Sequence, residues 1–206
     1  MKPPEVLYVP RNTPQKRLHA AWEDSQLVIL TGPAGTGKTA AALGEALSRA
    51  GKQQRDSGKL WLCRPTVAVE EDLGFLPGDL TAKLLPWLAP FGDCLGNLGH
   101  STLQELADWC ELVPLGMLRG RTISHGTLIV DEAQNATRAQ LVCAATRVGR
   151  GGRVVLCGDP EQADGPEALT AFASQVRHVP GVTWLRFDDA DQVRSEFVTS
   201  LLAALR

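Results

Sequence analysis

The sequence predicts an α/β fold in which helices cover both faces of a parallel sheet. Five short runs of apolar, β-favouring residues recur along the chain, at residues 27–31, 60–63, 127–131, 154–158 and 182–187. None of them alternates with polar residues, a pattern typical of strands buried on both faces. Segments with a helical pattern separate the runs, and such strand–helix alternation favours a parallel sheet.

The helices expected between these strands span residues 39–50, 137–148 and 166–176, and a last helix runs from about residue 190 to the C-terminus. The polar segment 51–59 is interpreted as a surface loop. The interval 66–124 is less regular, with helices expected near residues 81–94 and 101–111. So long an interval between two strands is typical of a functional insertion. We therefore expect residues 1–206 to form a single domain with a decorated insertion around 66–124.

Composition and charge place the chain among ordinary globular proteins. Of its 206 residues, 44% are hydrophobic and 21% are charged, which excludes a disordered or collagen-like chain. The formal net charge of −2 is far from that of a DNA-wrapping protein, so any nucleic-acid surface must be a local patch. No apolar run approaches the roughly 20 residues that span a bilayer, and the N-terminus lacks the apolar segment of a signal peptide. We expect a soluble, cytoplasmic protein.

A glycine-rich loop lies between the first predicted strand and the first predicted helix. Its sequence, GPAGTGKT, matches the pattern G-x-x-x-x-G-K-[ST] of a phosphate-binding loop. Successive main-chain N–H groups of such a loop turn toward a phosphate, and the helix N-terminus adds partial positive charge. Lys38 is placed to reach the β- and γ-phosphates, and the Thr39 hydroxyl to ligate Mg²⁺. The residues expected to bind the nucleotide are Gly32, Pro33, Ala34, Gly35, Thr36, Gly37, Lys38 and Thr39.

Two acidic residues, Asp131 and Glu132, end the third predicted strand within the sequence DEAQ. A carboxylate at the tip of a buried parallel strand lies beside the phosphate loop in such folds, where Asp131 would hold Mg²⁺ directly or through water. Glu132 is then placed to polarise an attacking water. A strand-tip acid can also be a plain helix cap, but beside a phosphate loop the metal and base roles are favoured.

Two glutamines extend the predicted site. Gln162 follows the fourth strand within GDPEQ, and the tight turn there would present it to the γ-phosphate as a sensor. An ordinary Gly-Asp-Pro turn is the alternative. Gln15 lies upstream of the phosphate loop, and its amide would pair with both the donor and the acceptor of the adenine edge. The alternative for Gln15 is a solvated residue near the start of a helix.

These motifs together resemble the first motor domain of superfamily 1 helicases. A closer resemblance, to the PhoH family of phosphate-starvation-inducible ATPases, comes from RPTV and LGFLPGDL within residues 64–80 and from PLGMLRGRT at residues 114–122. It implies a RecA-like P-loop NTPase domain that binds and hydrolyses ATP with Mg²⁺ and acts on RNA or single-stranded DNA. By motif it assigns catalysis to Lys38, Glu132 and Gln162, the metal to Thr39 and Asp131, and adenine contact to Gln15.

One motor domain has no second domain to supply a cationic finger to the γ-phosphate. We therefore expect a ring-shaped homo-oligomer, by resemblance a hexamer, with an arginine donated across each interface. The candidates are Arg119, Arg121, Arg147 and Arg194. For nucleic acid, Arg64 begins a segment in the position of a strand-contacting helicase motif, and Arg147, Arg150 and Arg153 form a basic turn. The alternative for this turn is an ordinary helix end, where cations favour the helix dipole and glycine forms the cap.

Two functions of different classes stay open. The first is a Mg²⁺-dependent ATPase motor that acts on RNA or single-stranded DNA. The second is a nucleotide-gated binding or assembly module, in which ATP holds an oligomer together without unwinding activity. A small-molecule kinase is disfavoured, because the sequence has no clear arginine-rich lid. Stimulation of ATP hydrolysis by a polynucleotide separates the first two functions.

Overall fold

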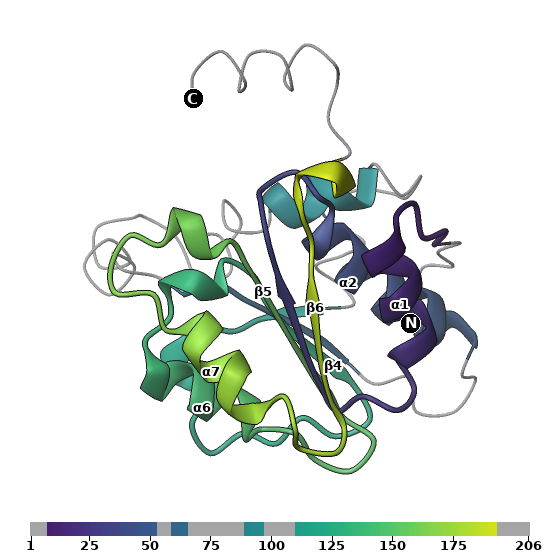
Figure 1. Ribbon diagram of the computed structural model, residues 1–206. Helices are drawn as coiled ribbons and strands as arrows, with labels where there is room; N and C mark the ends of the chain where they lie inside the picture. Colours follow the sequence, from purple (N-terminus) through teal and green to yellow (C-terminus); the bar gives the residue numbers. More distant parts are fainter. Residues whose placement is uncertain (1–7, 53–58, 66–88, 97–109, 193–206) are drawn as a thin grey trace.

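The computed structural model describes residues 8–52, 59–65, 89–96 and 110–192, and it confirms the predicted parallel sheet (Figure 1). The strands are β1 (Leu27–Thr31), β2 (Leu60–Cys63), β3 (Cys110–Leu112), β4 (Thr127–Val130), β5 (Arg153–Gly158) and β6 (Val182–Arg186). They lie in the order β3-β2-β4-β5-β1-β6, and every neighbouring pair is parallel. All but β3 coincide with a predicted strand to within one residue at each end.

Helices cover both faces of the sheet, as the strand–helix alternation predicts. The described helices are α1 (Thr13–Ala21), α2 (Lys38–Lys52), residues 89–96, α6 (Arg138–Ala145) and α7 (Leu169–Val176). The α1 and α2 helices lie on one side of the sheet, and α6 and α7 lie on the other (Figure 1). Short 3-10 turns complete the fold: η1 (Leu115–Leu118), η2 (Ala133–Asn135), η3 (Pro160–Gln162) and η4 (Asp189–Asp191).

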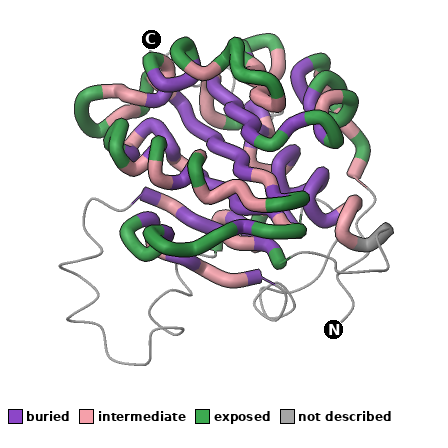
Figure 2. Tube along the Cα trace, turned by 90° about the horizontal axis from the view of Figure 1, so that it is seen from below, coloured by how far each residue is buried: buried purple, intermediate pink, exposed green. Residues whose placement is uncertain are grey.

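Two apolar clusters, one on each face of the sheet, form the core. Val28 and Leu30 of β1 pack into the cluster beneath α1 and α2. Leu27 and Ile29 of the same strand pack into the cluster beneath α6 and α7. Figure 2 shows the buried strands running through the middle of the molecule. Because both faces are covered, every second residue is as buried as its neighbours, which explains why the apolar runs do not alternate.

Two elements near the chain's N-terminus and in the insertion differ from the expectations. The α1 helix is not among the predicted helices; it begins after Asn12, whose side-chain oxygen accepts a hydrogen bond from the Gln15 N–H at 3.0 Å. The helix expected at 101–111 is wrong for its last two residues, because Cys110 and Glu111 belong to β3. Strand β3 has only three residues and is defined by parallel pairing with β2, a tertiary contact that outweighs local propensity.

The remaining helix boundaries shift modestly. The predicted helix 39–50 is α2, which extends to Lys52, so residues 51 and 52 of the predicted loop 51–59 are helical, and residues 53–58 lie outside the described residues. Thr137 forms a capping box with Gln140 at the start of α6, and α7 begins at Leu169 rather than residue 166. The predicted helical segments 81–88, 101–109 and 193–206 lie outside the described residues. None of the described helices has both the length and the apolar character needed to cross a membrane.

Candidate nucleotide site

The carboxyl ends of three neighbouring strands bring the predicted motifs together. Strands β4, β5 and β1 are adjacent in the sheet, and they are followed by Asp131, Asp159 and Gly32. Ligands of α/β folds bind at this edge of the sheet. A pocket of about 220 Å³ opens there, and its walls include the phosphate loop, Asp131, Glu132 and Gln162.

The phosphate loop adopts a tightly curled backbone as it leaves β1. Its glycines Gly32, Gly35 and Gly37 all have positive φ, of 141°, 81° and 81°. At Gly32 a Cβ atom would lie 2.2 Å from the Phe187 carbonyl oxygen, so only glycine fits. Such a curl is the backbone conformation in which successive main-chain N–H groups can converge on phosphate oxygens.

Lys38 lies inside this curl. Its Nζ donates to the carbonyl oxygens of Gly32 at 2.6 Å and Pro33 at 2.7 Å. Burial lowers the pKa of Lys38 below its ordinary value, because the charged ammonium loses hydration that the carbonyl dipoles replace only in part. An anionic phosphate in the pocket would compensate this charge directly.

Thr39 and Asp131 meet across the pocket, as the metal-site prediction requires. The Thr39 hydroxyl donates to Asp131 Oδ1 at 2.7 Å, and Asp131 is only 7% exposed. Burial raises the pKa of Asp131, although the hydrogen bond from Thr39 and the charge of Arg64 oppose the rise. A hydroxyl and a carboxylate oxygen in contact are the hard ligands that Mg²⁺ prefers.

Glu132 follows in a left-handed backbone conformation, with φ of 54° and ψ of 37°. This region is uncommon for residues other than glycine and costs on the order of 1 kcal/mol. It turns the Glu132 side chain to the pocket wall, where Oε1 accepts from Arg64 Nη2 at 3.0 Å and Oε2 accepts from Gln134 Nε2 at 2.7 Å. Arg64 also pairs with Asp131, at 3.4 Å between Nε and Oδ2. The Arg64 guanidinium therefore lies between Asp131, the predicted metal ligand, and Glu132, the predicted base.

The turn after β5 forms the opposite wall. Asp159 is 5% exposed; its Oδ2 accepts from the Ala34 N–H of the phosphate loop at 2.9 Å, and its Oδ1 accepts from the Glu161 N–H at 3.1 Å. The main-chain N–H of Gln162 donates to the Asp159 carbonyl at 3.0 Å. This 3-10 turn leaves the Gln162 side chain exposed at the rim of the pocket.

Gln15 lies behind the phosphate loop and does not line the pocket. It is 4% exposed, and its Oε1 accepts from the Arg11 N–H at 2.7 Å while its Nε2 donates to the Thr36 carbonyl at 3.4 Å. In this conformation its amide ties α1 to the loop. Adenine contact by Gln15 stays a prediction, and it requires the amide to exchange these two partners.

Comparison with known proteins identifies the family. The family model described as "PhoH-like protein" matches residues 8–206. A PhoH-like protein of Bacillus subtilis (strain 168) is 36% identical over 197 residues, which cover 92% of this chain and 61% of that protein. The chain belongs to the PhoH family. Protein PhoH of Escherichia coli (strain K12) is also 36% identical, over 94% of this chain and 57% of that protein. The chain thus spans about three-fifths of the length of these curated relatives.

The fold of this PhoH-family protein is that of P-loop NTPases. The large terminase of a thermophilic bacteriophage superimposes with a TM-score of 0.64 over 96% of this chain and 51% of that chain, at 13% sequence identity. An identity this low shows a shared fold alone. The RecA-like α/β class predicted for this chain is confirmed by that likeness and by the parallel sheet.

The candidate finger arginines of this PhoH-family protein differ in their surroundings. Arg121 pairs with Glu111, and Arg147 donates from Nε to the Cys143 carbonyl at 3.0 Å, at the end of α6. Arg119 follows η1, is exposed, and forms no ion pair with a described residue. Arg194 lies outside the described residues.

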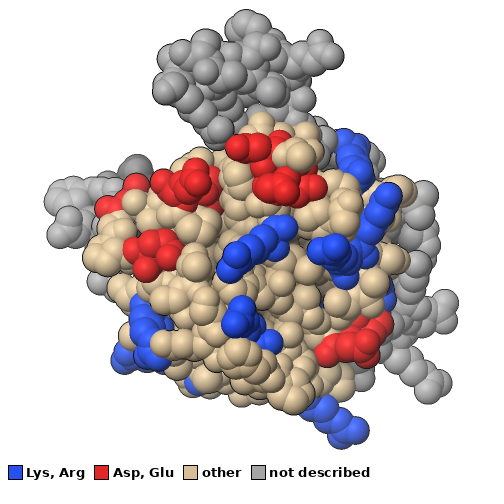
Figure 3. Space-filling model, in the orientation of Figure 1, with Lys and Arg blue, Asp and Glu red and all other residues tan. Residues whose placement is uncertain are grey.

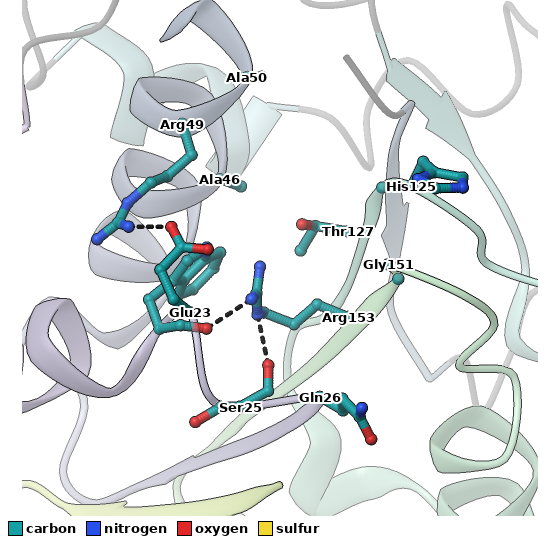
Figure 4. A pocket seen from close by; sticks show the side chains of 13 residues that line it. Glu23, Ser25, Gln26, Ala46, Arg49, Ala50, His125, Thr127, Gly151 and Arg153 are labelled. Carbon is teal, nitrogen blue, oxygen red and sulfur yellow. Dashed lines mark hydrogen bonds and ion pairs between the residues drawn. The ribbon is translucent and has the colours of Figure 1, made fainter. Parts of the chain in front are cut away.

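A second pocket, of about 310 Å³, lies at the amino ends of the strands, far from the phosphate loop (Figure 4). Arg153 occupies its floor, where the guanidinium lies over the Trp22 ring and donates to the carbonyl oxygens of Trp22 and Ser25. Arg49 pairs with Glu23 at one wall. Arg153 therefore ties the end of α1 to β5. Nucleic-acid contact by the basic turn stays a prediction.

Three residues of the candidate site are missed by the sequence reasoning: Arg64, Gln134 and Asp159. Arg64 directly follows β2, and the carboxyl end of β2 adjoins that of β4. The position of Arg64 directly after a predicted strand is the signal that could indicate a place in this site. From the sequence, Arg64 is instead interpreted as a contact for a nucleic-acid strand. Gln134 and Asp159 stand within the quoted motifs DEAQ and GDPEQ, but no local pattern reveals their hydrogen bonds.

Cys94 offers a chemical test of the pocket, because it lies in the pocket wall. Burial raises the pKa of its thiol to about 11, so the reactive thiolate is scarce at neutral pH. We expect alkylation of Cys94 by iodoacetamide to accelerate about tenfold per pH unit between pH 7 and 10, and saturating ADP with Mg²⁺ to slow it. Peptide mass spectrometry measures both, with Cys143 on α6 as the internal reference. Equal rates at Cys94 with and without ADP would place the nucleotide elsewhere.

Proposed function

We propose that this protein is a Mg²⁺-dependent ATPase that works as a motor on RNA or single-stranded DNA. The observation that carries the proposal is the arrangement at the phosphate-loop pocket. Lys38 lies within the loop, Asp131 is hydrogen bonded to Thr39, and Glu132 lies at the pocket wall. These are the parts by which P-loop enzymes position a nucleoside triphosphate, a metal ion and a water.

The residues present fit a nucleotide and a magnesium ion. The curled loop and the buried Lys38 ammonium offer N–H groups and a cation to phosphate oxygens. Thr39 and Asp131 offer two oxygen ligands, already 2.7 Å apart. When bound, Mg²⁺ would neutralise charge that develops on the β- and γ-phosphate oxygens. Arg64, which contacts both acids, holds the paired carboxylates in place before the metal ion enters.

Hydrolysis requires that a water be deprotonated as it attacks. In the proposed reaction the water oxygen bonds to the γ-phosphorus, and the bond from that phosphorus to the β,γ-bridging oxygen breaks. The water proton passes to the Glu132 carboxylate, which leaves ADP and inorganic phosphate. Lys38 stabilises charge on the phosphates, and Gln162 at the rim is placed to contact the γ-phosphate.

The nucleic-acid and oligomer parts of the proposal rest on local features. On the face shown in Figure 3, Lys and Arg side chains lie in separate groups with acidic side chains among them. Such a surface is suited to local contacts with a strand rather than to wrapping duplex DNA.

Lys38 is the one Lys or Arg among the described residues that line the pocket. We propose that a neighbouring subunit in a ring supplies the finger, with Arg119 as the first candidate because Arg121 and Arg147 have partners within the chain.

The test measures the rate of ATP hydrolysis and the mass of the protein particle under the same conditions. ATP hydrolysis is measured in Mg²⁺ alone, with homopolymeric RNA and with single-stranded DNA, and the mass of the particle is measured by sedimentation in the same buffers. The proposal predicts that a polynucleotide stimulates hydrolysis and that the particle is larger than one chain. An unchanged rate, together with an ATP-dependent change of mass, would instead support the nucleotide-gated assembly module.

The finger is tested by Arg119→Ala, with Arg177→Ala at the exposed end of α7 as the matched control. Loss of a trans finger lowers the rate of hydrolysis by about 10³-fold or more while ATP still binds. In mixtures of Arg119→Ala with Glu132→Gln, two variants that are each slow, activity should partly return, because a ring then pairs the intact base of one chain with the intact Arg119 of its neighbour. Full activity of Arg119→Ala would remove this residue from the mechanism.

A further inference from the structure

A chain of hydrogen bonds and ion pairs connects the residues of the candidate pocket. It begins at Thr39, at the end of the phosphate loop, and returns to Ala34 in the same loop. Its members, in order, are Thr39, Asp131, Arg64, Glu132, Gln134, Asp159 and Ala34. We call this set the pocket network. Four of its members carry a charged side chain. Gln134 is neutral, and it links the two carboxylate residues Glu132 and Asp159.

Gln134 is held in a fixed place and uses both ends of its amide. Its Oε1 accepts from the Asp159 N–H at 3.0 Å, and its Nε2 donates to Glu132 Oε2 at 2.7 Å. The residue is 2% exposed. Gly158 allows this close approach, because a Cβ atom there would lie 2.9 Å from both the main-chain nitrogen and Oε1 of Gln134. The amide can therefore face only one way, with its donor on Glu132.

Asp159, on the other side of Gln134, occupies an N–H group of the phosphate loop. Its Oδ2 accepts from the Ala34 N–H at 2.9 Å, although this loop is built to bind phosphate anions. A phosphate and the Asp159 carboxylate repel one another when both approach this part of the loop. Entry of a nucleotide would therefore move the Asp159 turn, and Gln134 connects that turn to Glu132.

We propose that Gln134 is a positioning residue that orients Glu132 and links its orientation to the Asp159 turn, which responds to nucleotide in the phosphate loop. The inference rests on the proposed ATPase function and adds a route from binding to the general base. Gln134 touches no reacting atom. It acts by holding Oε2 of Glu132, which orients the carboxylate. Oε1 accepts from Arg64 and keeps a second lone pair for the attacking water.

The first test is Gln134→Glu, which keeps an acceptor for the Asp159 N–H and removes the donor to Glu132. Its matched control is Gln175→Glu, an exposed residue on α7 that accepts a hydrogen bond from Arg138. A misplaced base lowers kcat by about 10²-fold, whereas KM for ATP and the affinity for ADP should stay within about twofold of wild type. In a Glu132→Gln background the same change should lower the residual rate little further, because its effect passes through Glu132.

A second variant, Asp159→Asn, tests the other end of the link and keeps the inference testable if Gln134→Glu fails to fold. Without the competing carboxylate, ADP should bind roughly five- to tenfold more tightly. Unchanged or weaker ADP binding by Asp159→Asn would show that the Asp159 carboxylate does not compete with phosphate for the loop, and would overturn the inference.

Wild-type activity separates the inference from the proposed function. If wild type hydrolyses ATP and Gln134→Glu matches Gln175→Glu in kcat, the inference alone fails. If wild type binds ADP without hydrolysing ATP, the proposed function fails and the inference falls with it. A parallel loss of kcat and ADP affinity in Gln134→Glu, with a lower unfolding temperature, would show a merely structural role and would also overturn the inference.

Discussion

Glu132→Gln should bind ATP as tightly as the wild type and hydrolyse it about 10²- to 10⁴-fold more slowly. The substitution keeps the shape of the side chain, and its remaining carbonyl oxygen can still accept a hydrogen bond from Arg64 or from Gln134, but not from both. The amide cannot take the proton of the attacking water. The measurement is single-turnover release of inorganic phosphate, with ATP affinity measured separately by a fluorescent analogue.

The matched control for this variant is Glu23→Gln, which makes the same chemical change at the opposite end of the sheet, where Glu23 pairs with Arg49. It should hydrolyse ATP at the wild-type rate. Undiminished turnover by Glu132→Gln would show that the base is another group.

Lys38→Ala should bind ADP with an affinity lowered by about 10²-fold or more. A hydrogen bond to a charged group contributes about 1.5–3 kcal/mol, and neutralisation of phosphate charge by the ammonium adds to it. The protein should still fold. Burial lowers the pKa of Lys38, which means that the buried ammonium loses favourable hydration. Its removal therefore relieves this desolvation penalty in the folded state. Calorimetric titration with ADP and thermal unfolding measure the two effects separately.

Lys16→Ala, on the exposed side of α1, is the control for Lys38→Ala and should bind ADP as the wild type does. If Lys38→Ala also kept wild-type affinity, the phosphates would have to bind away from the loop.

Much of the fold is predictable because its strands are buried on both faces. The β1 and β5 strands are continuous apolar runs that end in glycine-containing motifs, so strand and motif are recognised together. The edge strand β3 is different, because its three residues gain their conformation from pairing with β2. The α1 helix is also missed; it is short and depends on the Asn12 cap and on burial of Leu18 and Trp22.

In the candidate site, the main residues are predictable from the sequence, whereas the contacts between them are not. Lys38, Thr39, Asp131 and Glu132 are predictable because a known spacing or a strand end places each of them, and the structure brings them to one pocket. The connections among them are not predictable from local sequence. Arg64 and Glu132 are 68 positions apart, and Ala34 and Asp159 are 125 positions apart. Only the order of β2, β4, β5 and β1 in the sheet brings these pairs together.

We propose that this PhoH-family protein hydrolyses ATP at the pocket between the phosphate loop and the DEAQ motif. Release of inorganic phosphate from ATP, measured in Mg²⁺ for wild type and Glu132→Gln purified side by side, tests it most directly. We expect steady release by the wild type, stimulated by RNA or single-stranded DNA, and almost none by the variant. Equal release by the two proteins, or none by a wild type that binds ATP, would contradict it.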